Sequence, residues 1–261
     1  MSWSLCQNAD DFFQQRHGVL LKNESLHCLA FAAIKKAQNS TKTAGKHSFF
    51  TFREHQSTTA HAFTDNDGQT LILGPMDKLH IEALRGFLNT NAFFIQEIEG
   101  PRDVVIEFAE SWRQAENRPY HIEMNQGLYE LRHLINPAIR GGKLVAAKDP
   151  HEDILQRFLA GFLTDCFPNK PVPDGWIQAR CKRLIQEKKG YLWQNQDGQI
   201  VSMAAIVRES PNTTSISLVY TPTEHRAQGY AACVVAELSQ LQFERGKHAC
   251  NLHTDLFQES C

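Results

Sequence analysis

The sequence predicts an α/β protein that consists of two successive units. In each half, short strand patterns are followed by amphipathic helices. Each half also carries a hairpin signal, at residues 66–68 (Asn-Asp-Gly) and 197–198 (Asp-Gly), because these residue types tolerate the positive φ of tight turns. Residues 135–142, with a proline and paired glycines, are typical of a linker. We therefore expect one domain at residues 1–135 and another at residues 143–261.

The N-terminal half is expected to start with helices and to continue with strands. Apolar residues at positions 26, 29, 30, 31 and 34 recur at helical spacing, so the first forty residues are predicted to be helical. We predict strands at residues 49–52, 60–64, 69–73 and 92–98, and helices at residues 79–87 and 104–112 that each follow a Gly-Pro pair. Nothing in this half indicates a catalytic site.

The C-terminal half is expected to contain a strand, two helices, a meander of three strands, a helix and a last strand. These elements are predicted at residues 144–147, 152–162, 176–189, 191–194, 200–207, 214–220, 231–241 and 249–254. The strand at residues 214–220 alternates, which predicts Ile216, Leu218 and Tyr220 on one face of the sheet.

The composition favours an ordinary globular protein and excludes several classes. Hydrophobic residues make up 42% of the chain, charged residues 21%, and the formal net charge is −2. The chain shows no dense stripe of Lys and Arg, and no apolar run near the ~20 residues of a membrane span, so we expect neither nucleic acid nor membrane as a partner. The seven cysteines are scattered without a C-x-x-C pair, which predicts a reduced, cytoplasmic protein with no metal site.

The strongest functional signal is the turn between the strand at residues 214–220 and the helix that follows. Pro222 helps to end the strand, and Gly229 stands where the helix begins. The first turn of a helix exposes unpaired N–H groups and a partial positive charge, and a glycine lets an anion approach the backbone closely. Arg226 adds a cation at the rim. The pattern predicts a phosphate cradle, and a plain turn in which glycine permits tight packing is the alternative.

Residues 216–231, ISLVYTPTEHRAQGYA, resemble the central motif of the GCN5-related N-acetyltransferases (GNAT). The segments around residues 191–193, 201–204 and 250–256 resemble one bacterial subgroup, in which a degenerate acetyltransferase-like domain precedes the active one. The resemblance implies two mixed sheets flanked by helices, and acetyl-CoA as cosubstrate. It also implies main-chain contacts from the strand to pantetheine and from the turn to the diphosphate. The implied binding residues are Val219, Tyr220, Thr221, Arg226, Ala227, Gln228, Gly229, Tyr230 and Ala231.

The sequence departs from the family pattern after the last predicted strand. The family continues there with a helix and two strands, whereas this sequence ends at Cys261, so the C-terminal sheet is expected to be incomplete. We expect residues 249–254 to form an exposed apolar edge that a second copy of the chain could cover. A shortened protein, a fold completed by a partner chain, and a fragment are the three alternatives.

The implied reaction is attack of a neutral amine on a thioester in a ternary complex. It needs a base, donors for the oxyanion and an acid for the thiolate. The oxyanion donor implied by the resemblance is an N–H group near Val219, and the candidate bases are Glu209, His253 and Asp255, for each of which a solvated position is the alternative. We expect an N-acyltransferase that acts on an unidentified small-molecule or peptide amine. A catalytically impaired, CoA-binding regulatory module is the rival hypothesis, and a structural remnant is the third.

Overall fold

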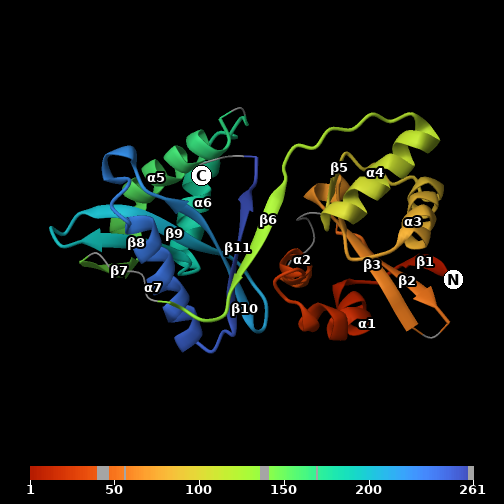
Figure 1. Ribbon diagram of the computed structural model, residues 1–261, viewed down its shortest axis with the longest axis horizontal. Helices are drawn as coiled ribbons and strands as arrows, with labels where there is room; N and C mark the ends of the chain where they lie inside the picture. The colour runs from red at the N-terminus through yellow and green to blue at the C-terminus, as the bar shows by residue number, and fades with distance from the viewer. Residues whose placement is uncertain (40–46, 56, 136–140, 169, 258–261) are drawn as a thin grey trace. The chain divides into compact units, whose positions relative to one another are not determined.

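A computed structural model of the chain describes residues 1–39, 47–55, 57–135, 141–168 and 170–257. The chain divides into two compact units, Met1–Asn125 and Gln126–Cys261 (Figure 1). This division lies before residue 135, where the sequence suggested that the first domain ends. Most of the predicted linker, residues 136–140, lies outside the described part.

The N-terminal unit contains one five-stranded mixed sheet between two layers of helices. Its elements are β1 (Ser2–Leu5), α1 (Ala9–Lys22), α2 (Cys28–Asn39), β2 (Phe49–Glu54), β3 (Ser57–Asp65), β4 (Thr70–Leu73), α3 (Lys78–Thr90), β5 (Glu97–Glu99) and α4 (Arg102–Glu116). The strand order is β1-β2-β3-β4-β5, and only the β4–β5 pair is parallel. Phe49 packs with α1 and α2 on one face, and Phe50 packs with α3 and α4 on the other, as the alternation of a strand requires.

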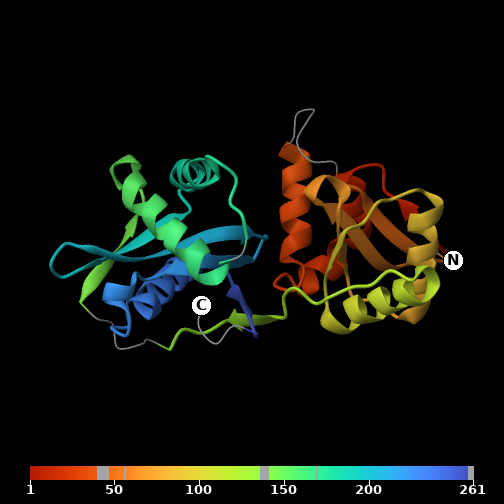
Figure 2. The ribbon, with the colours of Figure 1, turned by 90° about the horizontal axis from the view of Figure 1, so that it is seen from above.

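The C-terminal unit contains a six-stranded mixed sheet. Its elements are β6 (Gln126–Leu131), β7 (Gly142–Ala146), α5 (Glu152–Cys166), α6 (Trp176–Gln186), β8 (Gly190–Asn195), β9 (Ile200–Glu209), β10 (Thr213–Tyr220), α7 (Tyr230–Glu244) and β11 (Ala249–Asp255). The strand order is β6-β11-β10-β9-β8-β7. Helices α5 and α6 cover one face of this sheet and α7 covers the other (Figure 2).

The two units repeat the same order of elements. Each runs through a strand, two helices, a three-stranded meander, a helix and a strand parallel to the last strand of the meander. The predicted order of the C-terminal half is therefore confirmed, as are both hairpins: β3 pairs with β4, and β8 pairs with β9.

Three predictions about the strands are wrong for local reasons. The chain begins with β1 rather than with a helix, and the four residues of this strand bury one large side chain, Trp3. The strand predicted at residues 92–98 is reduced to β5, because Ala92 takes a φ of 55° directly after α3. Strand β10 does not alternate as expected: Ile216 packs on the α7 side, whereas Leu218 and Tyr220 pack on the α5 side.

The expectation of an exposed edge at β11 is also wrong. Strand β6 pairs with β11 in antiparallel register at six positions, from Cys250↔Leu131 to Asp255↔Gln126. The side chains of β6 are mostly exposed, so no apolar alternation marks it in the sequence. Main-chain hydrogen bonds, which the sequence does not display, hold this strand and cover the edge.

Within the described residues, no helix has both the length and the apolar character needed to cross a bilayer.

Candidate functional site

The central strands of the C-terminal unit part from one another near their middle. Strands β10 and β11 pair at three positions, the last of which joins Ser215 and Asn251, and the Ser215 hydroxyl donates to Asn251 Oδ1 at 2.7 Å. Both strands continue beyond this point, β10 to Tyr220 and β11 to Asp255, without further pairing between them in the described residues. We call this divergence the strand split. Its two sides offer main-chain groups to an extended ligand.

A β-bulge shapes the β10 side of the strand split. Ser217 lies opposite Ala205 and Tyr220 lies opposite Met203, so β10 has one residue more than β9 over this stretch. Leu218 adopts a φ of 53°, which is an unfavourable conformation for a non-glycine residue. The bulge explains the lost alternation and turns the main chain at Val219 out of the regular ladder. Strained residues of this kind concentrate at ligand sites.

The end of β10 is held by hydroxyl groups and by α5. The buried Ser202 hydroxyl donates to the Tyr220 carbonyl at 3.0 Å and lies 2.9 Å from the Thr221 hydroxyl. The Tyr220 ring packs against Phe158 of α5, with 5.9 Å between the ring centroids. Ser202 was not predicted from the sequence, although a polar residue within the apolar run of β9 is a usable signal. These contacts fix the approach to the turn that precedes α7.

Helix α7 begins without a side-chain cap. Gly229 is the N-cap residue, with φ 81°, and Ala227 has a φ of 59°. The first N–H group of the helix with an acceptor is that of Cys233, which donates to the Gly229 carbonyl at 3.1 Å. Among the hydrogen bonds of the described chain, none is donated by the main-chain amides of residues 227–232. Amides in left-handed turns at a helix N-terminus form a concave, electropositive anion site.

The Arg226 side chain lies at the rim of this turn, where it is already engaged. Its Nε donates to the Thr221 carbonyl at 2.9 Å, its Nη2 binds the Asp165 carboxylate, and its guanidinium lies 5.7 Å from the centre of the Tyr220 ring. The hydrogen bond to Asp165 raises the pKa of Arg226. The ion pair links the end of α5 to the turn, so the positive character of the turn comes mainly from its amides. Asp165 was not predicted, because 61 residues separate the partners.

The three candidate bases lie at different places. Glu209 lies opposite Thr214, on the closed side of the strand split, and pairs with Lys189 Nζ at 3.1 Å. His253 follows Asn251 by two residues and so lies beside the strand split; burial, and then the charge of Arg208, lower its pKa. Asp255 ends β11 and accepts the N–H of Phe257 at 3.1 Å. The geometry therefore favours His253 among the three.

The part of the chain that contains this site matches a known protein family. The model of the Acetyltransferase (GNAT) family matches residues 155–260, which contain the strand split and the start of α7. The C-terminal unit is a GNAT domain. The strand, turn and helix described above form the centre of this domain.

Solved structures extend the likeness to the whole chain. An acetyltransferase from the GNAT family of Colwellia psychrerythraea is 12% identical, with 99% of this chain and 91% of that chain covered and a TM-score of 0.57. A GCN5-related N-acetyltransferase from Sphaerobacter thermophilus is also 12% identical, with 99% and 88% covered and a TM-score of 0.59. At 12% sequence identity the similarity concerns the fold alone. It confirms an architecture of two mixed sheets flanked by helices, one sheet in the GNAT domain and the other preceding it. No curated protein sequence matches the chain.

Proposed function

We propose that this protein is an acyl-CoA-dependent N-acyltransferase that transfers an acetyl group from acetyl-CoA to an amine. The observation that carries the proposal is the set of unengaged amides at residues 227–232, at the uncapped start of α7 in a GNAT domain. A diphosphate is the ligand that such a turn suits, because several N–H groups and the helix dipole act on one anion.

The binding residues divide into two groups. Val219, Tyr220 and Thr221 would offer main-chain groups of the strand split to the amide-rich pantetheine arm. The diphosphate would be held by the turn that starts α7, namely Arg226, Ala227, Gln228, Gly229, Tyr230 and Ala231. Arg226 would contribute through its main chain and its residual charge, since its side chain is paired with Asp165.

The transfer would proceed by direct attack in a ternary complex. The amine nitrogen bonds to the thioester carbonyl carbon, an N–H group near Val219 stabilises the oxyanion, and the C–S bond then breaks. His253 would take the ammonium proton, because its lowered pKa keeps the imidazole neutral near pH 7; Glu209 and Asp255 are the remaining candidates. The thiolate takes a proton from solvent, and the products are an amide and CoA.

Titration calorimetry with acetyl-CoA tests the proposal. We expect Gly229→Glu to weaken binding by about 100-fold or more, because it places a carboxylate where a diphosphate would bind. Gly198→Glu is the matched control: Gly198 also has a φ near 80°, but it lies in the β8–β9 hairpin. Absence of binding by the wild-type protein, or equal losses in both variants, would contradict the proposed cradle.

Thioester consumption with a panel of amines tests the chemistry separately. Release of CoA that depends on an added amine supports an N-acyltransferase. Binding of acetyl-CoA without turnover would instead favour a CoA-binding regulatory module.

A further inference from the structure

A second irregularity in the C-terminal sheet determines where Arg208 lies. Ser215 lies opposite Arg208, whereas the next residue of β10, Ile216, lies opposite Ile206, so Val207 is an extra residue in β9. Ile206 and Ile216 both pack on the α7 side. Because paired residues share a face, the bulge turns Arg208 to the same face as Ser215.

That face is the one covered by α5 and α6. Cys250 precedes Asn251 and packs on the α7 side, where its thiol donates to the Ser239 carbonyl, so Asn251 faces the opposite side. Arg208, Ser215 and Asn251 therefore form a row across three strands at the closed end of the strand split. His253 follows Asn251 by two residues and lies on the same face.

Arg180 brings a second guanidinium to this face. It is partly buried and lies on α6 between Ile177 and Leu184, which are three residues before it and four after it and which pack against the sheet. Burial lowers the pKa of Arg180, and the charges of Arg183 and Arg208 lower it further, while Glu187 acts in the opposite direction. Arg180 therefore lies on a helix that covers the face to which Arg208 points, and the positive charges of the two groups repel.

Two carboxylates beside the pair, those of Glu187 and Glu209, are engaged elsewhere. Glu187 binds Arg183 Nε at 2.8 Å and Lys189 Nζ at 3.1 Å, and Glu209 binds the same Lys189. Within the described chain, neither the Arg180 guanidinium nor the Arg208 guanidinium makes a hydrogen bond or an ion pair. Two partly buried guanidinium groups without a carboxylate are a destabilising arrangement unless an anion joins them.

We propose that Arg180 and Arg208 bind a carboxylate of the acceptor, so that the substrates are amines that also carry a carboxylate, as amino acids do. This inference rests on the proposed N-acyltransferase function. Such a molecule, held by its carboxylate at the closed end of the strand split, has its amine directed toward His253 and the thioester. Guanidinium groups suit carboxylates because their N–H groups match the two oxygens in one plane.

Paired substrates test the inference. Each amino acid of a panel is compared with its carboxamide, and with its aminophosphonate analogue to separate a carboxylate from a phosphonate, by acetyl-CoA consumption. We expect kcat/KM for the best acid to exceed that for its carboxamide by about 30-fold, mainly through KM, since a charge-assisted pair is lost. Equal rates for acids and carboxamides would overturn the inference, and a preference for phosphonates would overturn the choice of carboxylate.

Two variants and one control locate the effect. Arg180→Gln and Arg208→Gln should each remove most of the preference for acids, while the calorimetric affinity for acetyl-CoA stays unchanged. Turnover of carboxamides should also stay unchanged in Arg180→Gln, whereas in Arg208→Gln it changes with the pKa of His253. Arg183→Gln removes a cation from the same helix, but one already paired with Glu187, and should keep the preference. Variants that slow acids and carboxamides equally would contradict a role in carboxylate binding.

The proposed function and this inference fail in different ways. Absence of acetyl-CoA binding removes the function itself, whereas binding and turnover without a preference for acids removes only the inference. If acetyl-CoA binds but no amine is consumed, calorimetry of the same acids with the acetyl-CoA complex decides. Binding of an acid that Arg208→Gln abolishes supports the site, and no binding of any acid overturns it.

Discussion

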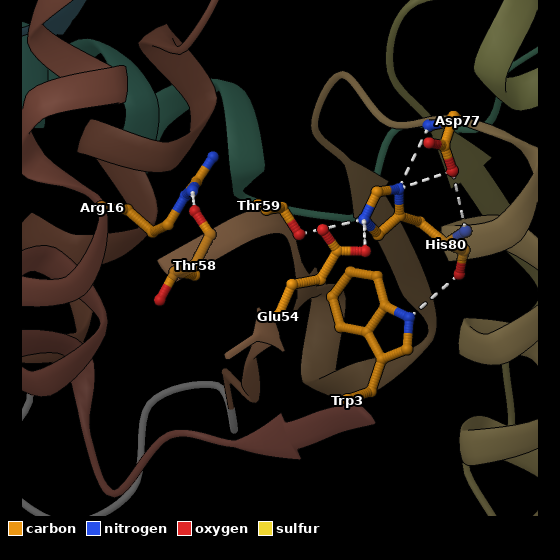
Figure 3. A network of polar contacts seen from close by, with 7 residues as sticks. All are labelled: Trp3, Arg16, Glu54, Thr58, Thr59, Asp77 and His80. Atoms are coloured by element: carbon orange, nitrogen blue, oxygen red, sulfur yellow. Dashed lines mark hydrogen bonds and ion pairs between the residues drawn. The ribbon is translucent and has the colours of Figure 1, made fainter. Parts of the chain in front are cut away.

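The two units repeat one order of elements, yet the helices at matching positions begin in opposite ways. Helix α7 starts at an uncapped glycine with unengaged amides, whereas α3 starts at Asp77, whose carboxylate accepts the N–H of His80 at 3.0 Å. The main-chain N–H of Asp77 donates in turn to His80 Nδ1 at 3.4 Å, which completes a capping box (Figure 3). In the N-terminal unit a carboxylate thus occupies the place where the C-terminal unit presents bare amides.

The cap of α3 is also tied to the neighbouring strands. The other ring nitrogen of His80 lies 3.0 Å from the Thr59 hydroxyl and 4.0 Å from Glu54, and its carbonyl accepts the indole N–H of Trp3 at 2.9 Å (Figure 3). An anion at this helix start would meet negative charge and a filled set of hydrogen bonds. The comparison teaches that the fold supplies the helix start, while the capping residue decides whether it can bind a phosphate.

The strands that precede α3 and α7 also differ, because the first has a regular register and the second does not. Leu73 of β4 lies opposite Ala62 in regular register, whereas β10 carries the bulge at Leu218. After β4, Gly74 packs on the ring of the buried His61; after β10, Thr221 contacts Ser202. The N-terminal unit therefore has the buried His61 ring at the position where the C-terminal unit has the small hydroxyl group of Ser202.

The largest expected difference between the units is their stability in acid. Burial lowers the pKa of His27 to about 4 and that of His61 well below its usual value, and the buried Arg16 guanidinium, 3.2 Å from His61 Nδ1, acts in the same direction. The unfolded chain takes up these protons near pH 6.5 and the folded unit does not. Stability is therefore complete above pH 6.5 and is lost as the pH falls toward 4, by about 3 kcal/mol for His27 alone.

Hydrogen exchange measured by mass spectrometry at pH 7 and pH 5 checks this prediction, since it resolves the two units. Peptides of the N-terminal unit should lose protection at pH 5 after correction for the intrinsic rate, and His27→Gln should reduce that loss. Equal loss in both units would show that the buried histidines do not distinguish them.

The next effect concerns the close approach of Gly74 to His61. A Cβ at residue 74 would lie 2.5 Å from His61 Cε1, and the ring is buried on all sides. We expect Gly74→Ala to destabilise the N-terminal unit by about 2 kcal/mol in urea unfolding, the usual cost of overpacking. Gly86→Ala in α3, where a Cβ meets nothing within 4 Å, should instead stabilise it slightly. Equal changes in the free energy of unfolding for the two variants would show that contact with the His61 ring is not the cause of the destabilisation.

The features that the sequence predicted well are local ones. The two hairpins and the turn at Gly229 depend on residues that adopt positive φ within a few positions, and the apolar spacing of α7 shows in the same short window. The order of elements in the C-terminal half follows from such windows alone. The glycine at the start of α7 could therefore be predicted from the sequence. Whether the main-chain amides beside it are hydrogen-bonded could not.

The features that the sequence did not predict join distant residues or depend on an irregular register. Pairing of β6 with β11 uses main-chain groups that every sequence has, so no residue type announces it. The ion pair of Arg226 with Asp165 depends on where the end of α5 meets the turn. The face of Arg208 depends on one extra residue in β9, which an alternating pattern cannot reveal.

The difference between the starts of α3 and α7 can be reduced by a substitution in the N-terminal unit. Asp77→Ala removes the side-chain cap of α3 and should cost about 1 kcal/mol in urea unfolding of that unit. Affinity for acetyl-CoA should not change, because the site proposed for it lies in the other unit. Asp103→Ala is the control: it removes an acidic residue from the first turn of α4, where no side-chain cap exists, and should cost only a few tenths of a kcal/mol. A gain of acetyl-CoA binding in Asp77→Ala would show that the carboxylate alone separates the two units.

The smallest effect is expected in the C-terminal unit, at Ala227 in the turn before α7. Its φ of 59° is unfavourable for a residue with a Cβ, so Ala227→Gly should stabilise the C-terminal unit by about half a kcal/mol in urea unfolding. The same change at Ala232, an exposed position within α7, should destabilise the unit by about 1 kcal/mol because glycine is a poor helix former. Opposite signs for one chemical change would establish that the turn before α7 holds a left-handed conformation in solution. Two losses of equal size would mean that residue 227 is helical there, and the turn would then lack the geometry that separates it from the start of α3.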